Sequence, residues 1–265
     1  GYLVADSQNG YDLARSFSSG LLRFADRDEK IWTNELSCFD RPYKGEKDYV
    51  VLAGDSFAWG YVSFNEKFGT LLGDILSRRV IQCGVPGYGT KQERIKVQRT
   101  ISKIKSPPAL IIVCYFSEND FTDDCRFPSR TVFDGQLFDI NVMSDNGIVM
   151  YDNSPAALEQ KADTIRRFGL LYTPHGIFSR EKALLRHESE LYHAIGWLFS
   201  RLFPRYKSEK IENTNDREFY CSERRARYPW VQKAYEEHLR NLKDFQMLAD
   251  RYGARLLVVL IPSKY

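Results

Sequence analysis

Short apolar segments alternate along this chain with longer amphipathic ones. Four apolar runs predict buried strands because of their length and branched side chains: they are Tyr49–Ala53, Val80–Cys83, Ala109–Phe116 and Arg255–Ile261. Glu66–Arg79 and Thr90–Lys105, which lie between the first three runs, carry apolar residues at helical spacing. A further helix is predicted over Pro229–Tyr252, because Pro229 stands at its start and Gly253 follows its end.

This order of strands and helices predicts a parallel sheet with right-handed crossovers and helices on both faces. We therefore expect an α/β fold, a three-layer α/β/α sandwich with a flavodoxin-like parallel sheet and a helical insertion. The predicted division is an N-terminal wrap over residues 1–46, a core formed by 47–120 and 229–265, and an insertion or lid over 121–228. The turn-rich start of the insertion predicts a hairpin, and helical patterns follow near Ala156–Phe168 and Arg180–Phe203.

Composition narrows the class of protein. The 265 residues are 43% hydrophobic, which supports a sizeable core, and the net charge of +3 comes without a basic stripe. We therefore expect no nucleic-acid partner. The five cysteines are widely spaced, which does not fit a zinc site or a disulfide framework but leaves a single surface disulfide open, with Cys83 and Cys114 expected as small buried hydrophobes. No apolar run reaches the length of a membrane span.

Polar turns follow each predicted strand, at the end where ligands bind in open parallel sheets. Gly54–Phe57 follows the first strand, Gly84–Thr90 the second, and Ser117–Phe121 the third. These turns bring a serine hydroxyl, accessible glycine amides and an asparagine carboxamide to one crevice. Such donors can form an oxyanion hole, which stabilises the charge that develops in acyl transfer. Ser56 taken alone would be read as a helix N-cap, but the three turns together favour a nucleophile.

Three of these segments resemble the first three conserved blocks of the SGNH hydrolases, also called GDSL esterases. They are Gly54-Asp55-Ser56, the turn around Gly87, and Ser117-Glu118-Asn119-Asp120, in which Ser117 replaces the usual glycine. The resemblance covers about half of the chain and looks like a bacterial subgroup with a long insertion. It implies that Ser56 is the nucleophile, that Gly87 and Asn119 help to hold the oxyanion, and that Asp55 and Asp120 are binding residues. It implies no cofactor and no metal.

The family takes its general base from an Asp-x-x-His block near the C-terminus, where the histidine deprotonates the serine. None of the four histidines, His175, His187, His193 and His238, has an aspartate three residues before it. Glu190 and His193 imitate the block but lie in the insertion, and His238 is expected to be solvated or packed. The chain as given thus lacks the base, which we expect beyond Tyr265.

These observations predict a serine ester hydrolase that acts, through an acyl-enzyme, on acyl esters, O-acetyl esters among them, of a carbohydrate or lipid. Alternatives are an O-acetyltransferase of the same fold, a non-catalytic glycan-binding or scaffold module, and a phosphoesterase with a metal on the acidic loop after Ser117. The expected partner is a small-molecule or glycan acyl ester. An apolar stripe over Leu184–Phe203 could touch lipid, but packing onto the sheet domain is favoured. The compartment stays open between the cytoplasm and an anchored position in the cell envelope.

Overall fold

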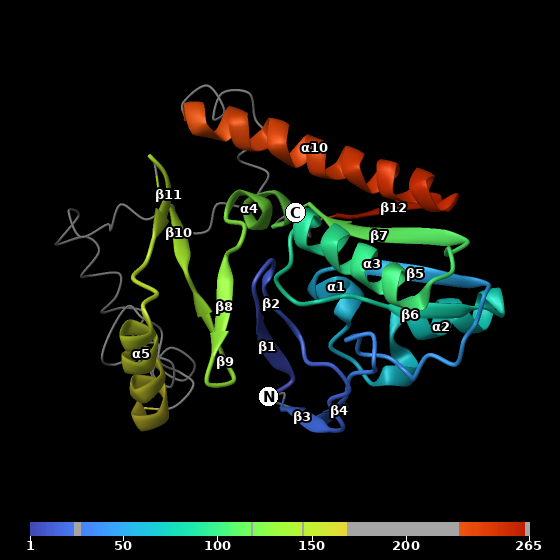
Figure 1. Cartoon of the computed structure of the whole chain (residues 1–265), viewed down its shortest axis with the longest axis horizontal. Coiled ribbons are helices and arrows are strands. Elements are labelled where there is room, and N and C mark those ends of the chain that lie inside the picture. The colour runs from blue at the N-terminus through green and yellow to red at the C-terminus, as the bar shows by residue number, and fades with distance from the viewer. Residues whose placement is uncertain (24–27, 118, 145, 169–227, 263–265) are drawn as a thin grey trace, which may run out of the picture.

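The structure is a computed structural model that describes residues 1–23, 28–117, 119–144, 146–168 and 228–262. Its centre is a four-stranded parallel sheet with the strand order β12-β7-β5-β6 (Figure 1). The strands are β5 (Tyr49–Gly54), β6 (Arg79–Gln82), β7 (Leu110–Phe116) and β12 (Arg255–Ile261). All four are the strands predicted from the apolar runs, with ends that differ by at most one residue.

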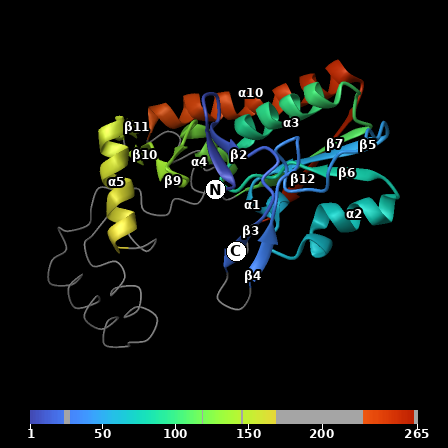
Figure 2. The same cartoon turned by 60° about the horizontal axis from the view of Figure 1, so that its bottom comes forward.

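Helices cover both faces of this sheet. α3 (Thr90–Ile104) and α10 (Pro229–Tyr252) lie on one face, and α1 (Ser56–Trp59) and α2 (Phe68–Leu76) lie on the other (Figure 2). A short 3₁₀ helix, η1 (Phe64–Glu66), precedes α2. The predicted α/β class with three layers is therefore confirmed. On the α3 side the core joins Val97 and Ile101 to Phe245 and Leu248.

Leu72 of α2 packs against the core, but the other large apolar residues of this helix do not, contrary to the simplest reading of their spacing. Phe68, Leu71 and Ile75 are exposed, whereas Gly69 and Gly73 are buried. A Cβ at Gly69 would overlap the side chain of Gln82 in β6, so the glycine lets the helix lie closer to the sheet than a larger residue would. The close approach turns the larger apolar side chains outward.

The N-terminal segment, for which we expected a wrap over residues 1–46, contains two antiparallel hairpins. They are β1–β2 (Leu3–Asp6 and Gly10–Leu13) and β3–β4 (Gly20–Arg23 and Asp28–Ile31). Tyr11, Ile31 and Phe39 are buried together with Trp59 of α1 and Tyr88. This cluster attaches the N-terminal segment to the loops at the carboxyl ends of the strands.

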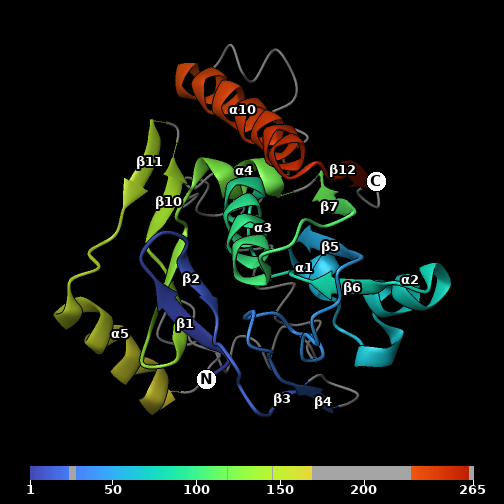
Figure 3. The same ribbon diagram turned by 45° about the vertical axis from the view of Figure 1, so that its right-hand side comes forward.

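The insertion begins with α4 (Asp120–Cys125). It continues with the hairpins β8–β9 (Arg130–Phe133 and Gln136–Asp139) and β10–β11 (Asn141–Ser144 and Gly147–Met150), and then with α5 (Pro155–Phe168). The predicted hairpin and the helix near Ala156–Phe168 are thus present, whereas Arg180–Phe203 lies outside the described residues. β8 packs beside β1 and β2, so the insertion contacts the N-terminal hairpin (Figure 3).

One long edge of the sheet is formed by β12, whose apolar side chains remain half exposed. Leu257, Val258 and Leu260 are the most exposed of these. Within the described residues β12 pairs with β7 alone. An apolar edge strand of this kind is a place where a further strand can pair. In the described part of the chain, no helix is both long and apolar enough to cross a membrane.

Candidate functional site

The order of the strands places the candidate site between β5 and β7. The chain leaves β5 toward β6 on one side and returns to β7 on the other, so the direction of connection reverses between β5 and β7. Open α/β sheets bind ligands at the carboxyl ends of strands at such a switch point. Ser56 directly follows β5 and Asn119 follows β7, so the fold brings both residues to this crevice.

Ser56 begins α1 in a sharp turn that only a glycine at position 54 accommodates. Gly54 has a φ of +149°, and a Cβ there would lie 2.6 Å from the Cβ of Ala58 and 2.9 Å from that of Cys114. The turn is held by Asp55, whose Oδ1 accepts a hydrogen bond of 2.9 Å from the Phe57 N–H. Asp55 therefore takes the N-cap role that Ser56 could have filled, which leaves the serine hydroxyl at the rim, where it is partly exposed.

Ser56 and Asn119 are connected through the carboxylate of Asp55. The Ser56 hydroxyl donates to Asp55 Oδ2 at 3.4 Å, and the Asn119 amide donates to the same oxygen at 3.3 Å. Asn119 Nδ2 also donates to Asp123 Oδ2 at 2.9 Å. The two predicted site residues thus share one acceptor, although they are far apart in the sequence.

Gly87 stands on the turn that follows β6, and its backbone conformation requires a glycine. Its φ is +75°, and a Cβ there would overlap Nη1 of Arg130. This turn is hydrogen-bonded to the end of β5, because the Val85 N–H donates to the carbonyl oxygen of Gly54 at 3.0 Å. Within the described part of the chain the Gly87 N–H has no hydrogen-bond partner, so it is free to bind an oxygen atom of a ligand.

Asp55 and Asp120, which we expected to be binding residues, are both fully buried. Asp120 Oδ2 accepts a bond of 2.7 Å from the Phe116 N–H and so closes the turn between β7 and α4. In this conformation neither carboxyl group can touch a substrate. Each instead fixes a turn that carries a predicted site residue, Asp55 that of Ser56 and Asp120 that of Asn119.

Behind the crevice lies a group of buried carboxyls. Burial raises the pKa of Asp55, and burial together with the other carboxyls raises those of Glu93 and Asp120 well above their usual values. Burial raises the pKa of Asp123 to about 7, although Arg130 and Arg126 act in the opposite direction. Both oxygens of Glu93 are buried without a partner, which fits a protonated acid. Among the described residues no three His, Cys, Asp or Glu side chains form a group that could hold a metal ion.

His238 is packed inside the protein, one of the two alternatives expected for it. It comes from α10 and is almost fully buried, with Nδ1 2.8 Å from Asp124 Oδ2 and Nε2 3.0 Å from the Tyr115 hydroxyl. Both ring nitrogens are thus occupied by partners other than Ser56. The other three histidines lie outside the described residues.

Three side chains at the crevice were not predicted. Phe57 directly follows Ser56 and Tyr61 stands five residues after it, and the two are 47% and 45% exposed. Arg130, from β8, lies on the side of Gly87 where a Cβ would point. Its Nε pairs with Asp139 Oδ1 at 3.1 Å. The aromatic pair could have been inferred from its nearness to Ser56 in the sequence. Arg130 could not, because it comes from the insertion and no local pattern marks it.

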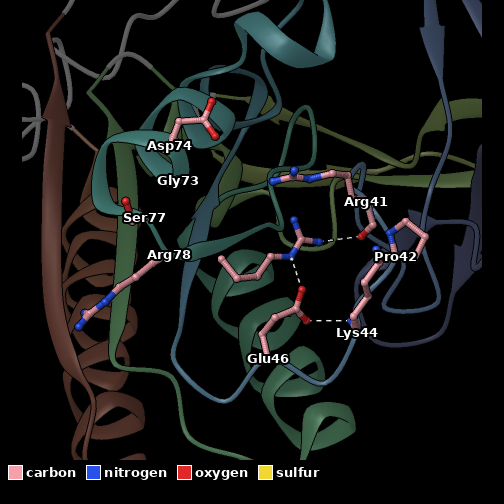
Figure 4. A pocket seen from close by; sticks show the side chains of 9 residues that line it. Arg41, Pro42, Lys44, Glu46, Gly73, Asp74, Ser77 and Arg78 are labelled. Atoms are coloured by element: carbon pink, nitrogen blue, oxygen red, sulfur yellow. Dashed lines mark hydrogen bonds and ion pairs between the residues drawn. The ribbon is translucent and has the colours of Figure 1, made fainter.

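A separate cavity of about 530 Å³ lies at the opposite end of the sheet (Figure 4). It is lined by residues that precede β5, Arg41 among them, and by residues of and just before the start of β6, where Arg79 stands. Arg79 is occupied there, because it donates to the Arg41 carbonyl oxygen at 2.7 Å and pairs with Asp40 and Glu46. Since this cavity is at the amino ends of the strands, it does not include any of the predicted site residues.

Comparison with known proteins adds little to this description. No family model matches the chain, and no curated protein matches it. Among solved structures, a mutant of the esterase AlinE4 is similar over 62% of this chain and 83% of its own length, with 19% sequence identity and a TM-score of 0.27. A similarity of that size carries no argument about function, so any function has to be argued from the site itself.

Proposed function

We propose that this chain carries the nucleophile and the oxyanion donors of a serine ester hydrolase of the SGNH type. The observation that carries the proposal is the shared acceptor at the switch point, where Ser56 and Asn119 both donate to Asp55. The unpaired Gly87 N–H supplies a further donor on the turn beside them. Acyl transfer requires donors of these kinds, and each of the three follows a strand of the parallel sheet, which supports the proposal.

In the proposed reaction the oxygen of Ser56 attacks the carbonyl carbon of an ester. The negative charge that develops on the carbonyl oxygen is held by the N–H groups of Ser56 and Gly87 and by the Asn119 amide. Collapse of this intermediate expels the alcohol and leaves an acyl-serine. Water then attacks the acyl group and releases the carboxylic acid. Because Asn119 donates to Asp55 and Asp123 in the free protein, one of these bonds must open when substrate binds.

The proton of Ser56 has to move to a base before or during the attack. In the free protein the serine hydroxyl donates to the carboxylate of Asp55 at 3.4 Å. His238 is turned toward Asp124 and Tyr115 and is therefore not assigned this role. We assign the base to a histidine of an Asp-x-x-His block, as the resemblance to SGNH hydrolases implies, with its aspartate orienting the ring.

The rim of the crevice favours a carbohydrate or lipid ester as substrate. Phe57 is half exposed beside the nucleophile, and its ring packs at 4.2 Å, centroid to centroid, against that of Phe116. Exposed aromatic faces suit both sugar rings and acyl chains. Arg130 adds a cationic group on the side of Gly87, which can donate to an oxygen-rich alcohol part of the ester.

A fluorophosphonate probe tests the nucleophile directly, because it labels activated serines. We expect the full-length protein to be labelled on Ser56, and Ser56→Ala to abolish labelling. Ser102→Ala is the matched control, since Ser102 is exposed on α3 and should be replaceable without effect. Labelling that survives in Ser56→Ala, or a folded full-length protein that is never labelled, would overturn the proposal and favour a non-catalytic module.

Hydrolysis and transfer differ only in the acceptor of the acyl group. Product analysis with an acetyl donor, with and without a glycan acceptor, separates the two. We expect acetate to be the main product in both reactions. Acetylated glycan as the main product would instead identify the O-acetyltransferase alternative.

A further inference from the structure

Two thiols from distant parts of the sequence meet in the core of the protein. Cys38 comes from the N-terminal segment and Cys83 directly follows β6, 45 residues later. Their Sγ atoms are 2.9 Å apart, closer than two sulfur atoms in ordinary van der Waals contact. Both cysteines are free in the structure, and both are essentially inaccessible to solvent.

The backbone on each side of the pair is fixed, so the approach does not depend on a flexible loop. Asn34 Oδ1 accepts hydrogen bonds of 3.0 Å from the N–H groups of both Leu36 and Cys38, and the Asn34 N–H donates to the carbonyl oxygen of Cys38 at 2.9 Å. On the other side the Cys83 N–H donates to the Leu52 carbonyl oxygen of β5 at 2.8 Å. Folding therefore brings these two sulfur atoms together reproducibly.

The surroundings of the pair make the two thiols unequal. Burial raises the pKa of Cys38 well above its usual value. Burial also acts to raise the pKa of Cys83, but the bond from Cys38, the Lys96 ammonium and Thr100 outweigh it and lower that pKa. Lys96 is held in place by Asp12 and by the Ser37 carbonyl oxygen, at 2.5 and 2.6 Å. With the segment docked, Cys83 is thus the thiol of the two that ionises more readily.

We propose that Cys38 and Cys83 form a disulfide that fastens the N-terminal segment to the end of β6. With a small-molecule disulfide as oxidant, the Cys83 thiolate, accessible while the segment around Cys38 is undocked, attacks one sulfur and releases the first small thiolate. The Cys38 thiolate then attacks the Cys83 sulfur of the mixed disulfide and releases the second. Two protein thiols are oxidised, one small disulfide is reduced to two thiols, and both protons pass to the released thiolates or to solvent.

The burial of the pair sets the time at which the bond can form. The small disulfide cannot reach Cys83 once the segment around Cys38 has docked, so oxidation belongs to folding or to a transient opening of that segment. The bond would lie at the start of the Gly84–Gly89 turn, which carries Gly87. It would thus tie the base of this turn to the part of the N-terminal segment that Asn34 organises.

Peptide mapping tests the bond without any mutation. The full chain is refolded from the reduced, denatured state with oxidised and reduced glutathione, alkylated under denaturing conditions and digested without reductant. We expect one linked peptide joining Cys38 to Cys83, two hydrogens lighter than the free pair, with the other three cysteines alkylated. Cys114 is the matched control, because it is buried and free as well. Full alkylation of Cys38 and Cys83 in refolded protein, or a random mixture of pairs, would overturn the proposal.

Thermal unfolding gives a second readout. A bond that closes a loop of this length should raise the Tm by about 10 °C over the reduced protein. Cys38→Ser and Cys83→Ser should each lose this dependence on reductant, while Cys125→Ser should keep it. An equal Tm for the oxidised and reduced wild type would contradict the proposal. The experiment can be repeated on Ser56→Ala, so its outcome is independent of the proposed esterase activity.

Discussion

The amide of Asn119 donates to the carboxylate of Asp55 at 3.3 Å, across the crevice between the ends of β7 and β5. The bond joins two turns that are 64 residues apart in the sequence. It places the carboxamide on the same acceptor as the hydroxyl of Ser56. The side chains of Ser56 and Asn119 therefore form one site only because β5 and β7 are neighbours in the sheet.

Asn119→Ala removes the carboxamide that we assign to the oxyanion. Loss of one such donor lowers kcat by about 10² to 10³, and we expect a decrease of that size in the rate of ester hydrolysis by the full-length protein. Asn146→Ala, at an exposed position in the β10–β11 turn, is the control and should leave the rate unchanged. A rate for Asn119→Ala within a factor of three of the wild type would exclude the assigned role.

Gly87→Ala tests the turn that carries the free N–H. The φ of +75° alone costs an alanine about 1 kcal/mol, and the new methyl group would in addition overlap Arg130. Gly135→Ala separates the two effects, because Gly135 has a φ of +72° and nothing within 4 Å of its Cβ position. In urea unfolding we expect Gly87→Ala to lose clearly more stability than Gly135→Ala. Equal losses would show that the overlap with Arg130 is relieved at no cost.

Asp123 should make stability depend on pH. Burial raises its pKa to about 7 in the folded protein, whereas an unfolded chain has the ordinary value near 4. The folded state therefore holds a proton that the unfolded state has lost, so this contribution is full below about pH 4 and disappears as the pH rises through about 7.

Asp123→Asn keeps an oxygen for the Asn119 amide but cannot ionise. We therefore expect the free energy of unfolding of the variant, relative to wild type, to improve as the pH rises from about 4 to about 7 and to stay level above that. Urea unfolding across this range measures the difference. A difference between the two proteins that does not change with pH would show that Asp123 does not titrate in this way.

His238→Ala distinguishes a structural histidine from a catalytic one. The ring bridges Asp124 and the Tyr115 hydroxyl inside the protein, so its removal leaves a cavity and unpaired buried groups. We expect a loss of about 3 kcal/mol in the free energy of unfolding. Fluorophosphonate labelling of Ser56 in the folded fraction should persist. Stable protein that can no longer be labelled would instead make His238 the base.

The strands and long helices could be predicted because their patterns are local. The four apolar runs become the four strands of the sheet, and Pro229 and Gly253 mark the start and end of α10. The outward face of α2 could not be predicted, because it depends on how closely Gly69 approaches Gln82 in another element. The same holds for α1, which has only four residues and no period of its own.

For the candidate site, the order of the elements in the sequence predicted which residues stand at the ends of strands, but not which other residues surround them. Ser56 and Asn119 follow neighbouring strands, so the parallel sheet was enough to predict that these two meet at Asp55. The partners that surround them come from other segments, such as Arg130 of the insertion beside Gly87. Nor does any pattern around Cys38 indicate that it meets Cys83, since that contact depends on the docking of the N-terminal segment.

Phe57 allows substrate binding to be tested apart from the chemistry. Its ring is 47% exposed beside Ser56, whereas Phe68 on α2 is 48% exposed outside the crevice. If Phe57 contacts the sugar ring or acyl chain, Phe57→Ala should raise the KM for a carbohydrate or lipid ester several-fold with little change in kcat. Phe68→Ala removes the same area of exposed aromatic surface and should change neither constant. An equal effect of both variants would point to a general loss of stability, and no effect of either would place the substrate elsewhere on the rim.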